Sequence, residues 1–219
     1  MGRKLLPIEN FIICFCKKNN LKLAEKAFRW SKILHAGQIR DDGSEYITHP
    51  IKVFLMLISV GIVNDIILAS ALLHDVIEET AITKKDLEEL FGKDVADVVT
   101  LLSKKKPISS HRYYFQIGKD IRAILIKSAD RMCNIADIVD IYTKERMERY
   151  VRETEKYILK MLEKSSLKKS KYNIAIAFFH DYIKVVMRAD KKVIALLEEN
   201  IFLKLENAKL KKALTRLRK

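Results

Sequence analysis

An apolar segment that ends in a cluster of ionisable side chains constrains the fold of this chain more than any other feature. Residues 66–73 carry no charge, and His74, Asp75, Glu78 and Glu79 then follow within six positions. Burying polar groups without partners costs several kcal/mol each. A fold that buries this segment must therefore give these side chains partners, and a bound cation is the simplest common partner.

Two further candidate ligands lie elsewhere in the chain. His49 stands directly before Pro50, and Asp130 follows the largely apolar stretch 121–129. A set of imidazoles and carboxylates suits a divalent transition metal such as Mn²⁺, Fe²⁺ or Zn²⁺, and three or four protein ligands leave positions open for water and phosphate. This pattern is typical of a metal-dependent phosphohydrolase.

The apolar residues recur at helical spacing throughout, and no segment alternates as a strand would, so we predict an all-α fold. Thr83 and Asp86 predict a capping box at the start of a helix that ends at Gly92. Further expected elements are one continuous buried helix over 66–79, a loop over 104–118, a helix over 121–141, a helix over 144–164 and a long helix over 173–218.

Helical geometry tests whether the candidate residues share a face. At about 100° per residue, Glu78 lies about 40° from His74. Around Asp130, the positions within about 60° are those of Lys127, Asn134 and Asp137. Any one of these residues could be a core residue with a structural partner. Two polar stripes on two otherwise buried helices favour a functional site instead.

Length and composition limit the classes of protein to which this chain can belong. The chain has 219 residues, enough for one domain and an extension, and 49% of them are hydrophobic. The longest apolar run, residues 53–63, is too short to cross a bilayer, so we expect no membrane partner. Residues 1–10 lack the pattern of a signal peptide. The three cysteines form no CxxC pair, which favours a reduced, cytoplasmic setting.

The charge of the chain is unevenly distributed. The formal net charge is +14, and the excess of Lys and Arg lies after residue 103. A basic half could steer a polyanionic substrate or bind nucleic acid. We favour a solvated helical surface for the basic tail, so nucleic acid is not an expected partner.

Several motifs, in order along the chain, resemble the HD hydrolase domain of RelA/SpoT-type alarmone enzymes. These are His35–Gln38, Arg40, Tyr46–Pro50, Ala71–Thr80 and Lys127–Asn134. The resemblance covers roughly residues 20–145, and the synthetase domain of the long family members is missing. It implies an HD-domain helical bundle over residues 1–165, followed by a basic helical C-terminal extension over 166–219.

The resemblance also implies roles for the metal ligands and the catalytic residues. His49, His74, Asp75 and Asp130 would hold one Mn²⁺ per chain. Glu78 and Glu79 match the Glu-Asp pair thought to position or deprotonate the attacking water. Glu79 departs from that pattern, because Asp is usual at its position.

Other residues match substrate-binding positions of the family. Arg40 matches an arginine that packs against guanine, and Asn134 matches a residue near the sugar and phosphate. Lys127 matches a conserved basic position, and Asp137 shares its helical face. Tyr46 is a further candidate, for which a packing role is the alternative. Asp41 and Asp42, which directly follow Arg40, remove a positive charge that the family usually has at the nucleotide rim.

The activity that the resemblance implies is hydrolysis of (p)ppGpp to GDP or GTP plus pyrophosphate. Another HD-type nucleotide phosphohydrolase would share the same metal ligands, for example an NADPH 2′-phosphatase, a nucleotidase or a dNTPase. A non-catalytic binding module that uses the basic C-terminal half is the third hypothesis, which the intact ligand set disfavours.

The end of the chain carries a heptad pattern. Leucines recur every seven residues at 196, 203, 210 and 217, which makes them d positions, and Val193, Asn200, Asn207 and Leu214 are then a positions. Asn at an a position is typical of parallel dimers. We therefore predict a homodimer through residues 193–217. The alternative is a helix that packs back onto its own domain.

Overall fold

The computed structural model describes residues 7–104, 108–136 and 143–217, and its regular structure is helical. In chain order the helices are α1 (Pro7–Lys18), α2 (Lys22–Leu34), α3 (Thr48–Ser59), α4 (Asp65–Leu72), α5 (Val76–Glu79), α6 (Lys84–Phe91), α7 (Lys93–Leu102), α8 (Ser110–Ile117), α9 (Ile121–Ala136), α11 (Lys144–Glu153), the π-helical turn η1 (Thr154–Leu159), α12 (Lys160–Ser166) and α13 (Asn173–Leu217). Within these residues no strand forms, apart from an isolated bridge between Ile39 and Glu45. The predicted all-α fold is confirmed.

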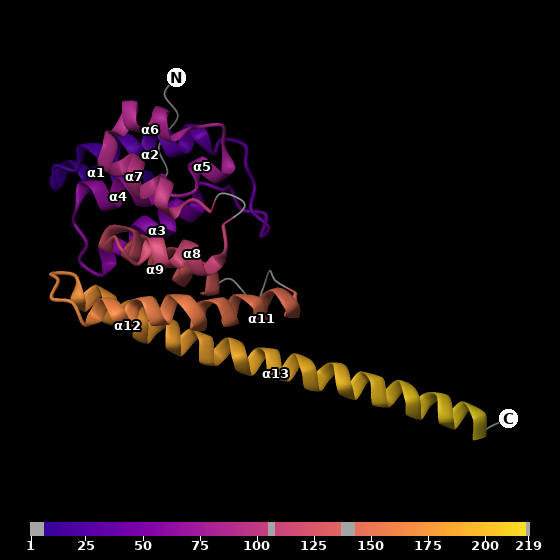
Figure 1. Cartoon of the computed structure of the whole chain (residues 1–219). Helices are drawn as coiled ribbons and strands as arrows, with labels where there is room; N and C mark the ends of the chain where they lie inside the picture. Colours follow the sequence, from indigo (N-terminus) through magenta and orange to yellow (C-terminus); the bar gives the residue numbers. More distant parts are fainter. Residues whose placement is uncertain (1–6, 105–107, 137–142, 218–219) are drawn as a thin grey trace.

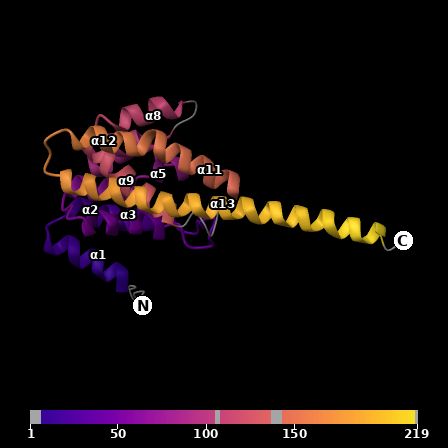
Figure 2. The ribbon, with the colours of Figure 1, turned by 90° about the horizontal axis from the view of Figure 1, so that it is seen from below.

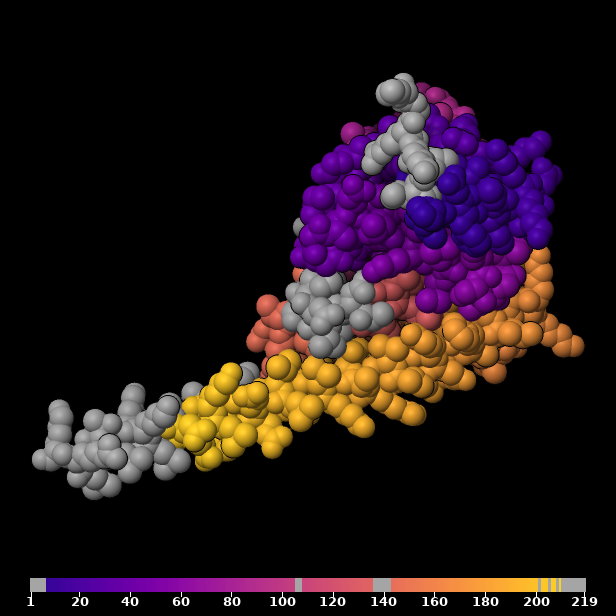
Figure 3. Space-filling view, turned by 180° about the vertical axis from the view of Figure 1, so that it is seen from behind, coloured from indigo at the N-terminus to yellow at the C-terminus, as the bar shows by residue number. Residues whose placement is uncertain are grey.

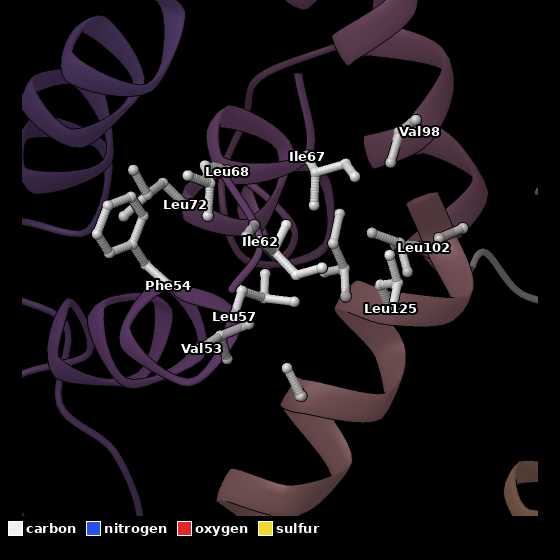
Figure 4. Packing of buried hydrophobic residues seen from close by; sticks show 14 of the residues in the cluster. Val53, Phe54, Leu57, Ile62, Ile67, Leu68, Leu72, Val98, Leu102 and Leu125 are labelled. Carbon is white, nitrogen blue, oxygen red and sulfur yellow. The ribbon is translucent and has the colours of Figure 1, made fainter. Parts of the chain in front are cut away.

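The core lies between α3, α4, α7 and α9 (Figure 4). Phe54 and Leu57 of α3 and Leu68 and Leu72 of α4 are fully buried, as is Leu125 of α9. Burying side chains of this size contributes about 1.5–3 kcal/mol each. The two helices that lead into the candidate ligands, α4 and α9, are therefore held by the best-packed part of the molecule.

A carboxylate joins α2 to α4. Asp65, at the start of α4, accepts hydrogen bonds from the backbone N–H groups of Leu23 and Ala24, at 3.0 and 2.8 Å. These are the N–H groups that the first turn of α2 leaves without helical partners, and an anion is favourable at that end of a helix. This contact fixes the start of α2 against the helix that leads to His74.

Our prediction of one continuous helix over residues 66–79 is wrong. α4 ends at Leu72, a turn covers residues 73–75, and α5 then begins at Val76. The imidazole of His74 donates from Nδ1 to the carbonyl of Ala71 at 2.8 Å. That carbonyl would bind a backbone N–H in a continuing helix, so the side chain replaces the helical hydrogen bond where the chain turns.

Our prediction of a loop over residues 104–118 is wrong for its second half, where α8 forms. The Ser109 side chain accepts a hydrogen bond from the backbone N–H of Arg112 and caps α8. Tyr113 and Tyr114 on this short helix are buried. Proline and serine suggested a loop, but burial of the two aromatic rings stabilises the helix.

The expected C-terminal helices form the lower layer of the molecule (Figure 1). Residues 144–166 run as α11, η1 and α12, and the first half of α13 packs against them and against α9. The second half of α13 projects beyond the bundle (Figure 2). Within the described part of the chain, no helix combines the length and the apolar character needed to cross a bilayer.

Candidate metal centre and active-site pocket

Two histidines meet in the interior of the bundle. His49 lies in the first turn of α3, and His74 lies in the turn after α4. Their ring centroids are 5.1 Å apart, and each residue is only 3% exposed. Histidines this deeply buried require polar partners, because burying the ring nitrogens without them is costly.

The hydrogen bonding of His74 leaves one ring nitrogen available to a cation. A carbonyl oxygen can only accept, so in the neutral imidazole the contact with Ala71 places the proton on Nδ1 and the lone pair on Nε2. This buried Nε2 makes no well-formed hydrogen bond, although Asp75 Oδ1 lies 3.2 Å from it. Metal-binding histidines are commonly oriented in this way, with the second nitrogen bound to a carbonyl. His74 therefore fits a metal ligand.

The carboxylates of the predicted ligand set lie beside these nitrogens. Asp130 Oδ1, on α9, is 3.1 Å from His49 Nε2 and 3.8 Å from His74 Nε2. Among the described residues, His49, His74 and Asp130 offer ligand atoms that all lie within 4.8 Å of one another. Asp75 Oδ2 lies 3.7 Å from His49 Nε2. The four residues come together as predicted, and the three-residue cluster fits a divalent metal.

The electrostatics of the cluster favour bound positive charge. Burial alone would lower the pKa of His74, but the charges of Asp75 and Asp130 outweigh it and raise that pKa to about 9. Burial would likewise raise the pKa of Asp130, but the Lys127 ammonium holds it well below its usual range. Two ionised carboxylates beside two imidazoles form a site that attracts a cation.

Three side chains predicted to bind substrate also contact the candidate ligands. Lys127 donates to Asp130 Oδ2, and Asn134 donates to Asp130 Oδ1, both at 2.6 Å. The Tyr46 hydroxyl donates to Asp75 Oδ2 at 3.0 Å. Groups in these positions orient the carboxylates and set their charge.

The cluster opens into a pocket of about 400 Å³. His49, Asp75 and Asp130 lie among its lining residues, together with Arg40, Tyr46, Glu79, Lys127 and Asn134. The lining also includes Ile39, Asp41, Asp42, Arg146 and Tyr150. Ionisable groups of both signs therefore surround the volume directly above the candidate metal ligands.

The sequence analysis missed the wall of the pocket that α11 supplies. Arg146 and Tyr150 are four residues apart, so they share one face of this helix. That spacing is visible in the sequence, but nothing in it shows that this face is turned toward the pocket. The approach of α11 to the pocket comes only from the fold.

Arg146 also changes the interpretation of the acidic rim. Its Nη1 lies 2.8 Å from Asp41 Oδ2. The neighbouring Asp42 accepts hydrogen bonds from the backbone N–H and the hydroxyl of Ser44. Arg146 of α11 therefore brings a positive charge to the rim of the pocket, where it pairs with Asp41.

The two candidate catalytic carboxylates have different surroundings. Glu79 lines the pocket, and burial, followed by the charges of Asp75 and Glu78, raises its pKa above the ordinary value. Glu78 accepts a hydrogen bond from the backbone N–H of Lys104. Asp137, the remaining predicted substrate contact, lies outside the described residues.

A buried arginine supports the back of the site. Arg131 is 3% exposed, its Nη2 donates to the Tyr114 hydroxyl at 2.8 Å, and it lies 3.3 Å from Glu153 Oε2. Its guanidinium carbon is 4.0 Å from the centre of the Tyr150 ring. Through these contacts Arg131 joins α9 to α8 and α11, and it holds a pocket-lining tyrosine in place.

Comparison with known proteins agrees with this geometry. A family model described as an HD domain matches residues 27–116. Over 158 residues the chain is 35% identical to the bifunctional (p)ppGpp synthase/hydrolase SpoT of Escherichia coli K12, a match that covers 67% of this chain and 22% of that protein. It is 36% identical over 140 residues to a probable guanosine-3′,5′-bis(diphosphate) 3′-pyrophosphohydrolase of Synechocystis, covering 59% of this chain and 18% of that protein.

The chain thus spans about a fifth of the length of these curated relatives. Among solved structures, it is similar to a metazoan orthologue of SpoT that hydrolyses ppGpp, with a TM-score of 0.61 and 24% identity. That match covers 76% of this chain and 94% of the other, and it supports the fold.

Proposed function

We propose that this chain, whose residues 27–116 match an HD-domain family model and which is similar to SpoT-type enzymes over 158 residues, is a metal-dependent hydrolase of guanosine 3′,5′-bis(diphosphate). The reaction removes pyrophosphate from the 3′ position and leaves GDP, or GTP from the 5′-triphosphate form. The observation that carries the proposal is the His49, His74 and Asp130 cluster at the base of a pocket lined with arginine and lysine.

The proposed metal ligands are His49, His74, Asp75 and Asp130, and the proposed metal is Mn²⁺. The donor set supports this choice, because imidazole and carboxylate together suit Mn²⁺, Fe²⁺ and Zn²⁺. When bound, such a cation polarises a phosphoryl oxygen and makes a nearby water more acidic. The lone pair of His74 Nε2, left available by the hydrogen bond to Ala71, supports this assignment.

The carboxylates beside the pocket are proposed to handle the proton of the attacking water. Glu78 and Glu79 are the assigned pair, which orients the water and accepts its proton. Glu79 lines the pocket, and its raised pKa makes it a better proton acceptor than an ordinary glutamate. The hydrogen bond from Lys104 holds Glu78 in one orientation beside it.

The basic side chains are proposed to neutralise and position the phosphates. A polyphosphate repels an attacking water through its own charge, so fixed cations near it lower the barrier. Arg40, Lys127 and Arg146 line the pocket from three different elements. Arg40 lies over the Tyr46 ring at 5.9 Å, which leaves a flat guanidinium face for a base to stack on. Asn134 and Asp137 complete the proposed substrate contacts.

A substrate panel with the purified full chain tests the reaction. With Mn²⁺ present we expect ppGpp and pppGpp to be cleaved with release of pyrophosphate, and EDTA to abolish turnover. NADPH and dNTPs run in parallel represent the other phosphohydrolases that this metal site could serve. Cleavage of either without loss of ppGpp would reject the alarmone substrate and retain the phosphohydrolase chemistry.

Two organisational proposals accompany the reaction. Residues 1–165 are proposed to carry the catalytic site, and residues 166–219 are proposed as an extension. The chain is also proposed to form a homodimer through its C-terminal helix, which the leucine heptad supports. The described part of this helix includes Leu196 and Leu203, whereas the side chains of Leu210, Leu214 and Leu217 lie outside it.

A further inference from the structure

The long helix α13 has two apolar faces that point in opposite directions. One face packs on the molecule's own body, and its side chains Ile176, Phe179, Ile183 and Met187 are buried. The other face is exposed along the same stretch and beyond it. Its large apolar residues, 40–85% exposed, are Ile174, Phe178, Tyr182, Val185, Leu196 and Leu203. A monomer rarely leaves so continuous an apolar surface uncovered.

The exposed face follows the spacing of a coiled coil. From Phe178 to Leu203 the positions on this face are separated by alternating steps of four and three residues. They are Phe178, Tyr182, Val185, Ala189, Lys192, Leu196, Glu199 and Leu203, and all eight are exposed. We call this set the seam. A mean spacing of 3.5 residues keeps such a face turned toward one partner helix over its whole length of about 40 Å.

The seam differs from the heptad pattern first seen in the sequence. Both include Leu196 and Leu203, but the earlier pattern pairs them with Val193. In the structure Val193 is half-buried, and Phe179, fourteen residues before it on the same side of the helix, is fully buried against the body. The exposed seam therefore uses Lys192 in place of Val193 and extends back to Phe178.

The polar positions of the seam decide the direction of a partner helix. In a parallel pair, Lys192 would face Lys192 of the second copy, and Glu199 would face Glu199. In an antiparallel pair centred between residues 195 and 196, Lys192 of each copy faces Glu199 of the other. Like charges in a seam are unfavourable, and opposite charges are favourable. The antiparallel direction satisfies both positions.

Charges beside the seam fit the same alignment. Lys184 and Arg188 lie before the centre and Glu206 lies after it, whereas Glu198 already lies 2.7 Å from Lys144 of α11. The same centre places Lys184 beside Glu206 of the second copy. The projecting half of each helix then covers the exposed seam of the other from Val185 onward. Beyond its contact with α11 through Glu198, α13 projects past the body (Figure 3).

We infer that a second copy of this chain docks antiparallel along the seam of α13, with Lys192 of each copy paired to Glu199 of the other. This inference rests on the proposed homodimer and is independent of the proposed reaction. It assigns the partner, the direction and the central contact.

Charge substitutions in the full chain, followed by sedimentation equilibrium, test the inference. Lys192→Glu should raise the dimer dissociation constant about tenfold, because it places four carboxylates at the centre of the seam. The double variant Lys192→Glu with Glu199→Lys should restore wild-type association. Lys204→Glu is the control: it makes the same charge change at an exposed position outside the seam, and it should leave the mass unchanged.

Each alternative gives a different result. A parallel dimer in the register of the leucine heptad would lose mass with Lys204→Glu, because Glu199 at a g position there faces Lys204 at an e position of the second copy. The double charge exchange would not restore that dimer. A wild-type monomer at tens of micromolar would overturn the inference outright. Circular dichroism confirms that each variant is folded, and ppGpp turnover is measured on the same samples. Loss of association with retained turnover separates this result from any failure of the proposed reaction.

Discussion

The guanidinium of Arg40 donates a hydrogen bond of 3.3 Å to Asn134 Oδ1, and Asn134 Nδ2 donates to Asp130 Oδ1 at 2.6 Å. Arg40 lies at the rim of the pocket, and Asp130 lies at the candidate metal cluster. A single asparagine therefore connects the proposed nucleotide contact to a proposed metal ligand. Because its oxygen accepts from Arg40 and its nitrogen donates to Asp130, the Asn134 amide is held in one orientation.

Replacing Asn134 by alanine should weaken both functions together. The Asp130 carboxylate loses a hydrogen bond, and Arg40 loses the group that orients it. We expect metal affinity to fall about tenfold, as for other residues that support metal ligands, and the KM for ppGpp to rise. Asn207→Ala, at an exposed position of α13, is the control. Isothermal titration with Mn²⁺ measures the first effect, and unchanged metal affinity would reject the supporting role.

Removing a ligand should affect metal content and stability together. His74→Ala takes away the imidazole that binds the Ala71 carbonyl and faces the cluster. It removes one candidate ligand from the cluster and leaves the Ala71 carbonyl without the hydrogen bond from His74, which costs about 1–3 kcal/mol. We expect less than one bound metal per chain and a lower melting temperature than for His180→Ala, a histidine of α13 distant from the cluster. Full metal occupancy of the His74 variant would contradict its assignment as a ligand.

Substituting either candidate catalytic glutamate should lower kcat and leave the metal content unchanged. Glu78→Gln and Glu79→Gln keep the shape of each side chain but cannot accept a proton, so we expect kcat to fall about 100-fold or more. Metal content and melting temperature should match those of Glu88→Gln, an exposed position on α6. Metal analysis distinguishes the roles, because loss of metal in either variant would make that glutamate a ligand.

The residue types and their apolar surroundings were enough to predict that His74 and Asp130 lie in one buried polar cluster with His49. His74 and Asp130 end apolar stretches that had to be buried, and both required partners. The break after Leu72 was not predictable from periodicity, because it depends on a hydrogen bond from a side chain to the Ala71 carbonyl. Periodicity places a residue on a helix face, but it does not show which backbone groups the side chain binds.

In the C-terminal part of the chain, periodicity likewise does not show which face of a helix is buried. The leucine repeat was visible in the sequence, but α13 has apolar residues on two faces. Only the packing of Phe179 and Ile183 against the body shows which face remains exposed. The contribution of Arg146 to the pocket was equally hidden, since it depends on where α11 lies after the chain folds.

Asp190 should make the stability of this protein depend on pH. The residue is 3% exposed, none of the described residues donates a hydrogen bond to its Oδ2, and burial raises its pKa to about 6. The folded state then binds a proton more readily than the unfolded chain between pH 4 and 6, so this group lowers the free energy of unfolding as the pH rises through that range.

Asp190→Asn should therefore be more stable than the wild type at pH 7, by about 1–3 kcal/mol. The difference should shrink toward zero as the pH falls below 4, where the wild-type carboxyl becomes protonated in the unfolded state as well as in the folded state. Urea unfolding of both proteins across this range measures it, and the control is Asp181→Asn, an exposed position of the same helix. A difference that does not change with pH would show that Asp190 does not titrate as its burial requires.

Arg146 and Asp41 should change substrate affinity in opposite directions. If Arg146 contacts a phosphate, Arg146→Ala should raise the KM for ppGpp about tenfold, because a hydrogen bond to a charged group contributes about 1.5–3 kcal/mol. Asp41→Asn should lower the KM, since it removes the carboxylate that lies 2.8 Å from Arg146 and competes with the phosphate. Arg149→Ala, an exposed arginine on the same helix, should leave the KM unchanged. If Arg146→Ala and Arg149→Ala raise the KM equally, the general charge of α11 attracts the substrate and Arg146 makes no specific contact.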